Sequence, residues 1–314
     1  MFSSGPGARS RKRYQNQNKS LVLSTNNQLP VIYLVDGSLA HTGAFACARN
    51  FARTLVGRAH VVLVIPRQSA LAAQETSDFH EVIRLPFHNL RRSIGSVLLY
   101  LPGLLISSLM LSRRIQRDQA SVLIANDFYL MQVPMSRLFG FRGRIFTWVR
   151  IDPAVFGRVS SFWLWAVTVY SDRIVAVSNH IKVLLPCSLS AEVIYDAIDS
   201  ADLAVDFECS PSSQTFAFIG NYIPGKGQDI AVEALSLVVL EFPETRIEFY
   251  GGDMGLDKNK EFRRSLERRA AELGLSGNVF FGDFMEEPKS VLKSKLAALN
   301  LSQSESFSLT VLEA

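Results

Sequence analysis

The chain has 314 residues, of which 48% are hydrophobic and 20% charged, and its formal net charge is +4. This length allows two domains of ordinary size, and this composition excludes a globally disordered chain. The positive charge belongs to the N-terminal tail, whose first twenty residues contain no acid and five basic side chains, namely Arg9, Arg11, Lys12, Arg13 and Lys19. The rest of the chain is close to neutral, so we expect no nucleic-acid partner.

The N-terminal residues 1–28 are predicted to form a disordered basic tail, of a kind suited to contact with an anionic membrane. Only a short apolar run, residues 21–23, follows the basic residues, which excludes a secretory signal. The three cysteines, Cys47, Cys187 and Cys209, form neither a metal spacing nor an even disulfide framework. We therefore expect a cytoplasmic protein without a metal site. Its basic tail would allow peripheral contact with the inner face of the membrane.

Apolar, strand-like runs alternate with helix-like segments from residue 29 to residue 200. Strands are predicted at residues 31–35, 60–65, 121–125, 144–149 and 172–177, and helices after residue 43, at residues 128–139 and after an N-cap at Ser178. This alternation predicts a parallel sheet covered by helices on both faces. Residues 29–200 are accordingly predicted to form one α/β domain.

One segment of this half, residues 97–111, is strongly apolar and lies between pairs of arginines. As a helix it would span about 22 Å, which is short of the hydrocarbon core of about 30 Å, and Pro102-Gly103 is expected to interrupt it. We favour a buried helix of the α/β domain. The alternative is a helix that rests in the bilayer interface with its arginines at headgroup level.

Residues 201–213 lack periodicity and are predicted to be a linker, after which the alternation starts again. Residues 214–314 are predicted to contain strands at 215–219, 246–250, 279–281 and 297–301, with helices at 228–241 and 258–273. The fold class is thus α/β, with two Rossmann-like domains that face each other across a cleft, the usual place for a ligand.

A glycine-rich turn, residues 220–227, follows the strand at 215–219 and leads into a helix. A P-loop would need Ser or Thr where Gly227 stands, and a dinucleotide fingerprint would need glycine where Ile230 stands. A third interpretation fits every position: Lys226 on a tight turn faces a diphosphate across the cleft. The alternative is a solvent-exposed turn lysine.

Two glutamates eight positions apart, Glu305 and Glu313, lie on a polar loop and on the helix that follows it. Taken alone, Thr310 with Glu313 is best explained as a capping box. Together with Lys226, at the same carboxyl edge of a parallel sheet, the loop is better explained as part of a ligand site.

These residues resemble the nucleotide-sugar-binding domain of the retaining family 4 (group 1) glycosyltransferases, which have the GT-B fold. The resemblance rests on the turn at residues 220–227, the Gly251-Gly252-Asp253 strand end, residues 271–282 and the two glutamates. The first half is more loosely similar to the acceptor-binding domain, through the Gly43 loop and residues 174–178, and residues 193–199 resemble the family's link between domains.

The resemblance implies transfer of a hexosyl group from a nucleoside-diphosphate sugar with retention of configuration, in surface polysaccharide or glycoconjugate synthesis. Lys226 would neutralise the diphosphate and Glu305 would lie beside the transferred sugar, as the two catalytic residues. Further donor contacts are implied at Asn221, Gly252, Ser306, Phe307, Ser308, Leu309 and Glu313, with Glu313 on the ribose. Acceptor contacts are implied at His41, Gly43 and Arg150, to a saccharide or a lipid-linked saccharide. No Asp-x-Asp pair occurs, so a metal-independent mechanism without a cofactor is expected.

The chain departs from the family pattern at several positions. Asn221 stands where the family has an arginine, and Arg150 stands near a histidine that is absent here, although such an arginine more often pairs with a neighbour such as Asp152. A lone loop histidine such as His41 is more often simply solvated. The sequence ends at Ala314, where family members continue, so we expect a C-terminally truncated second domain. These departures motivate an alternative function, a non-catalytic GT-B-like binding or assembly protein.

Overall fold

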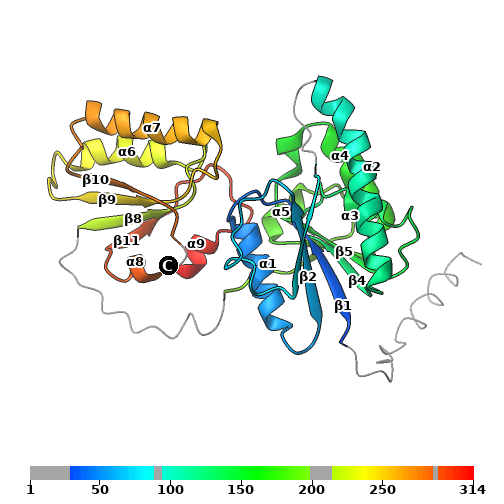
Figure 1. Ribbon diagram of the computed structural model, residues 1–314. Helices are drawn as coiled ribbons and strands as arrows, with labels where there is room; N and C mark the ends of the chain where they lie inside the picture. The colour runs from blue at the N-terminus through cyan, green and yellow to red at the C-terminus, as the bar shows by residue number, and fades with distance from the viewer. Residues whose placement is uncertain (1–28, 88–93, 199–213, 286–288) are drawn as a thin grey trace, which may run out of the picture.

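Two separate parallel β-sheets form the framework of the protein (Figure 1). The computed structural model describes residues 29–87, 94–198, 214–285 and 289–314, so the predicted tail at 1–28 and the predicted linker at 201–213 lie outside it. The strand order is β3-β2-β1-β4-β5-β6-β7 in the first sheet and β10-β9-β8-β11 in the second. The chain passes from the first sheet to the second between β7 and β8. The exact domain boundaries stay a prediction.

The first sheet buries its central strands on both faces, because apolar residues fill them without alternation. In register, Leu34 of β1 lies beside Leu63 of β2 and Ile124 of β4, and all three side chains are buried. The strands are β1 (Val31–Val35), β2 (His60–Pro66), β3 (Glu81–Leu85), β4 (Val122–Ala125), β5 (Arg144–Val149), β6 (Arg173–Ala176) and β7 (Glu192–Val193). Five of them were predicted; the edge strands β3 and β7 were not, since β3 is charged and β7 has only two residues.

Helices cover both faces of the first sheet. Helix α1 (Gly43–Thr54) packs on one face, where Phe45, Ala48 and Ala52 join the apolar core of β1 and β2. The other face carries α2 (Ile94–Arg117), α3 (Gln132–Met135), α4 (Val159–Tyr170) and α5 (Asn179–Leu184), with the 3-10 turn η1 (Pro153–Phe156) before α4. This division follows from right-handed crossovers, because the chain moves outward from β1 to β3 and then returns past β1 to β4.

Two predictions about this helical layer were wrong, and one helix was missed. Helix α2 continues through Pro102, because losing one backbone hydrogen bond does not break a helix of 24 residues whose later turns pack on the sheet through Leu111 and Ile115. The helix predicted at 128–139 is reduced to the four residues of α3, flanked by turns. Helix α4 was not predicted at all, since its apolar residues lie all round it.

The second sheet is smaller and is built as predicted. Its strands are β8 (Thr215–Ile219), β9 (Arg246–Tyr250), β10 (Val279–Gly282) and β11 (Ala297–Leu299), and its helices are α6 (Gln228–Val238), α7 (Asp257–Glu272), α8 (Lys289–Leu292) and α9 (Leu309–Glu313). Phe218, Phe249 and Leu266 form its core beneath α6 and α7. Strand β11 pairs directly with β8, so the loop after β11 lies next to the turn after β8.

Among the described helices, none combines the length and apolar character needed to span a bilayer. Helix α2 is long, yet its last turns carry Arg113, Arg114 and Arg117.

Candidate functional site

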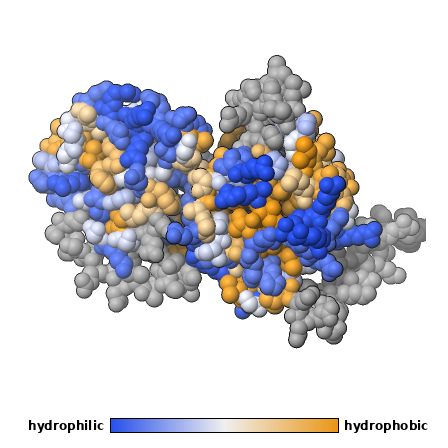
Figure 2. All heavy atoms as spheres, in the orientation of Figure 1, coloured by the Kyte–Doolittle hydropathy of each residue, from blue (hydrophilic) through white to orange (hydrophobic). Residues whose placement is uncertain are grey.

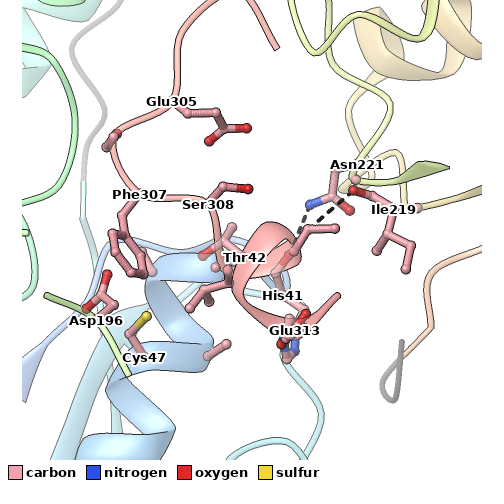
Figure 3. Close-up of a pocket in the computed structure, with 18 of the residues that line it drawn as sticks. His41, Thr42, Cys47, Asp196, Ile219, Asn221, Glu305, Phe307, Ser308 and Glu313 are labelled. Carbon is pink, nitrogen blue, oxygen red and sulfur yellow. Dashed lines mark hydrogen bonds between the residues drawn. The ribbon is translucent and has the colours of Figure 1, made fainter. Parts of the chain in front are cut away.

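The carboxyl edges of both sheets line one pocket of about 690 Å³ (Figure 3). The first half contributes the start of α1 and the residues after β5 and β7, and the second half contributes the turn after β8 and the loop between β11 and α9. In parallel sheets this edge is the usual place for ligands, because loops and helix starts converge there. The pocket is therefore the candidate functional site.

The turn after β8 is shaped by glycines that have positive φ angles. Gly225 has φ 93° and Gly227 has φ 90°, and a Cβ on Gly227 would lie 2.3 Å from the backbone oxygen of Leu301. Ser302 and Gln303 reinforce this close approach, because the amide of Gln303 donates to the Gly225 carbonyl at 3.0 Å. The turn and the loop after β11 thus form one unit that presents Lys226 to the pocket.

Lys226 and Glu305 form an ion pair inside the pocket. The Lys226 Nζ lies 2.7 Å from Glu305 Oε1, and the two side chains are 34% and 28% exposed. Both lie at adjacent strand ends, since β11 pairs with β8. The sequence predicted that both residues share a site; their direct pairing was not predicted. An anionic ligand at Lys226 must compete with this carboxylate.

The loop between β11 and α9 carries the other predicted donor contacts. Ser308 is the N-cap of α9, where its side chain accepts a hydrogen bond from the Val311 amide. The predicted capping box was therefore wrong: the Thr310 hydroxyl instead donates to the Ile219 carbonyl at 3.4 Å, and so anchors α9 to the end of β8. Ser306, Phe307, Ser308, Leu309 and Glu313 all line the pocket.

Asn221 connects the two halves of the chain. Its side-chain oxygen accepts from the Gly252 amide at 3.0 Å, and its side-chain nitrogen donates to the His41 carbonyl at 3.3 Å, as the dashed line in Figure 3 marks. Gly251 lines the pocket and lets the end of β9 approach the backbone of Gly220, because a Cβ on Gly251 would lie 2.1 Å from the Gly220 oxygen. Gly252, predicted as a donor contact, does not line the pocket; it bonds to Asn221 and, through its carbonyl, to the Tyr222 amide at 2.9 Å. The amide of Asn221 thus holds the turn after β8 against the first half.

The Glu305 loop also rests on the first half, through two contacts that the sequence did not predict. The Ser178 hydroxyl donates to the Ser306 carbonyl at 2.6 Å, and the rings of Tyr195 and Phe307 lie 6.0 Å apart. Ser178 was identified as an N-cap, and it is one, because it accepts from the Ile181 amide. No local signal in the sequence pairs it with a loop 128 residues later.

Arg150 is buried beside the pocket and is held by several partners. Its Nη1 donates to Asp196 at 2.6 Å, its Nε donates to Asn126 at 2.8 Å, and its guanidinium lies over the Trp148 ring. The predicted pairing with Asp152 was wrong, because Asp152 instead caps η1 by accepting from the Ala154 amide. Arg150 lines the pocket, yet its bonds to Asp196 and Asn126 fix it there.

Two buried titratable groups, the Asp127 carboxyl and the Cys47 thiol, lie close to Arg150. Burial raises the pKa of Asp127 to about 7, against the opposing hydrogen bonds from the amides of Arg150 and Phe128. Burial likewise raises the pKa of the Cys47 thiol to about 12, on the α1 face that lines the pocket. The Cys47 thiol therefore stays protonated near neutral pH, whereas the Asp127 carboxyl is divided between its neutral and charged forms there.

His41 and Gly43 lie at the entry to α1 and line the pocket. His41 is not a solvated loop residue as expected: its Nδ1 lies 3.1 Å from Glu75 Oε1, and its ring contacts Phe284 of the second half. Thr42 caps α1, and a Cβ on Gly43 would lie 3.6 Å from Leu309. Eleven of the twelve residues predicted for the site line this pocket, and Gly252 is the exception.

Comparisons with known proteins support the fold, and one family model matches the second half. Residues 207–314 match the family model described as glycosyl transferases group 1. A search of curated proteins gave no significant match.

Three solved structures have a similar fold across most of the chain. Anabaena HepE in complex with UDP and glucose has a TM-score of 0.73 at 16% identity, over 91% of this chain and 78% of that one. Sucrose-phosphate synthase from Thermosynechococcus elongatus has a TM-score of 0.69 at 15% identity, over 90% and 78%. The lipopolysaccharide outer core galactosyltransferase WaaB has a TM-score of 0.61 at 14% identity, over 91% and 78%. At such identities the likeness concerns the fold alone. The predicted class, an α/β protein with two Rossmann-like units in the GT-B arrangement, is confirmed.

Proposed function

We propose that this protein transfers a hexosyl group from a nucleoside-diphosphate sugar to a saccharide or lipid-linked saccharide, with retention and without a metal. The observation that carries the proposal is the Lys226–Glu305 pair, 2.7 Å apart at the carboxyl edge of the second sheet, in a pocket that both halves line. The match of residues 207–314 to the group 1 glycosyltransferases supports it, because that region contains both residues. HepE, of similar fold, has been solved in complex with UDP-glucose.

Each residue of the pair has a distinct part in the proposed reaction. The Lys226 ammonium neutralises the charge that grows on the diphosphate as the bond to the sugar breaks. The Glu305 carboxylate, released from Lys226 by the competing diphosphate, lies where positive charge develops on the sugar ring. We propose that Ser306, Phe307, Ser308 and Leu309 hold the sugar, and that Asn221, Gly252 and Glu313 complete the donor side.

The acceptor is proposed to enter over the first half, past His41, Gly43 and Arg150. Arg150 contributes a fixed positive charge, because three side-chain oxygens and the Trp148 ring of the first half already position it. We place the reaction in the cytoplasm, in surface polysaccharide or glycoconjugate synthesis, with peripheral contact of the protein with the membrane.

Nucleotide binding tests the proposal directly. Thermal unfolding is followed with UDP, GDP and ADP, and we expect at least one of them to raise the melting temperature. Lys226→Ala should abolish the shift, because it removes the diphosphate cation, whereas Lys258→Ala on the exposed face of α7 should leave it unchanged. The absence of a shift with all three nucleotides contradicts the proposal.

Asn221 favours the second candidate, a non-catalytic binding protein. Its amide is committed to Gly252 and His41, so one diphosphate cation of the resembled family is missing. Hydrolysis of a nucleotide sugar separates the two candidates. Slow hydrolysis that is lost in Glu305→Gln, with nucleotide binding kept, supports the transferase; binding without any hydrolysis or transfer supports the alternative.

A further inference from the structure

Helix α2 directs five large apolar side chains toward solvent. Leu101, Leu105, Ile106, Leu109 and Met110 are between 36% and 60% exposed. The buried side of the same helix carries Leu104, Leu111 and Ile115 together with three serines, of which Ser108 and Ser112 have hydroxyls without a hydrogen-bond partner among the described residues. The outer side of a helix on the surface of a protein in water is normally polar. The outer face of α2 is therefore suited to an apolar neighbour.

Helix α4, on the same face of the first sheet, also exposes apolar side chains, among them two aromatic rings. Phe162, Trp165 and Val169 are 57%, 56% and 53% exposed, and the rings of Phe162 and Trp165 stack at 5.9 Å. The two helices belong to one layer, because Leu104 of α2 and Trp163 of α4 share a core cluster, against which Tyr100 of α2 also packs. We use the name α2/α4 apolar surface for these exposed residues of the two helices, namely Leu101, Leu105, Ile106, Leu109, Met110, Phe162, Trp165 and Val169.

Basic residues border the α2/α4 apolar surface. The exposed side of α2 continues from Leu109 to Arg113 and Arg117, and Arg158 is exposed just before α4. Neither α2 nor α4 contains an acidic residue. Figure 2 shows this change of character, with hydrophobic surface along the middle of α2 and hydrophilic surface at its C-terminal end. Arg117 is partly neutralised by Asp118 at 2.9 Å, so Arg113 is the stronger contributor.

We propose that the α2/α4 apolar surface docks this protein on an anionic lipid bilayer. Leucine, isoleucine and methionine side chains would enter the acyl boundary, and the Phe162–Trp165 pair would lie at headgroup level, where amphipathic aromatic rings are favoured. Arg113, Arg117 and Arg158 match the negative charge of the headgroups, a complementarity that a second copy of the same basic surface lacks. The inference deepens the proposed function, on which it rests for its purpose: it names the surface that brings the cleft to a membrane-bound acceptor.

Vesicle binding by the full chain tests the docking surface. Co-sedimentation is measured with vesicles of phosphatidylcholine alone and of phosphatidylcholine with phosphatidylglycerol, and we expect binding mainly to the second. Leu105→Gln/Ile106→Gln should weaken partitioning about tenfold or more, because two large apolar side chains no longer enter the bilayer. Arg113→Gln/Arg117→Gln should remove most of the preference for anionic vesicles.

A matched pair of substitutions provides the control. Leu237→Gln/Leu240→Gln alters two leucines of the second half that are 71% and 81% exposed, and should leave vesicle binding unchanged. Trp165 gives a second readout, since its emission should shift to the blue on vesicles and should not shift in the Leu105→Gln/Ile106→Gln variant.

Three results overturn the inference: no binding to either vesicle, binding unchanged by Leu105→Gln/Ile106→Gln, or a dimer in solution that this variant converts to a monomer. The nucleotide-induced thermal shift is measured on every variant. Vesicle binding without any such shift contradicts the proposed function and leaves the docking surface standing, and the reverse result contradicts the docking surface alone.

Discussion

At the scale of single residues, Gly227 shows how one missing side chain defines the site. Its positive φ and its contact with Leu301 bring the turn after β8 against the loop after β11. A P-loop would require a hydroxyl residue at this position, which the Leu301 backbone does not leave room for. The same contact places Lys226 within reach of Glu305.

We expect Gly227→Ala to destabilise the protein by about 2 kcal/mol or more, because the new Cβ adds a clash with Leu301 to the backbone strain. Gly274→Ala is the control, since Gly274 has φ 75° and nothing within 4 Å of a Cβ, so that only strain of about 1 kcal/mol is expected. Urea unfolding measures both. Equal losses in the two variants would show that the contact with Leu301 is unimportant.

At the scale of elements, the start of α5 fixes the loop that carries Glu305. The Ser178 hydroxyl accepts from the Ile181 amide as an N-cap and donates to the Ser306 carbonyl. One side chain therefore stabilises a helix of the first half and holds a loop of the second half. Phe307 reinforces this arrangement by packing on the core of the first half beside Tyr195.

Ser178→Ala should lower the free energy of unfolding by about 1 kcal/mol, as the loss of an N-cap does, and should also reduce the nucleotide-induced thermal shift. Ser178→Thr keeps the hydroxyl and should restore most of both quantities. Calorimetry with and without UDP measures them. A loss of stability with an undiminished nucleotide shift would indicate that the bond to Ser306 has no role in the site.

At the scale of the whole molecule, the two sheets direct their carboxyl edges at each other (Figure 1). Residues from both edges line the pocket. Cys47 reports on this arrangement, because it lies on the pocket face of α1 and is only 6% exposed. Cys187, by contrast, is exposed on the surface of the first half.

Thiol modification at pH 8 should distinguish the two cysteines. Burial raises the pKa of Cys47 to about 12, so little reactive thiolate is present, and we expect it to react about a hundredfold or more slowly than Cys187. The rates are measured on two variants, Cys187→Ser/Cys209→Ser and Cys47→Ser/Cys209→Ser, with urea-unfolded samples as the reference. Similar rates in the two folded variants would contradict the burial of the Cys47 thiol.

The sequence by itself determined most elements and the composition of the site. Strand and helix periodicities are local, so β1, β8 and α7 could be predicted, and a lysine and a glutamate that each follow a strand could be assigned to the same sheet edge. The unpredicted elements lack such a pattern: β3 is charged, β7 is very short and α4 is apolar all round.

Only the tertiary structure decided which residues meet. The pairing of β11 with β8, the attachment of Arg150 to Asp196 and the bond from Ser178 to Ser306 join residues that are distant along the chain. The outward direction of the apolar face of α2 is equally a tertiary result, because the helix chooses its buried side by the shape of the layer beneath it. Local patterns specify elements, whereas contacts between elements depend on how the whole chain packs.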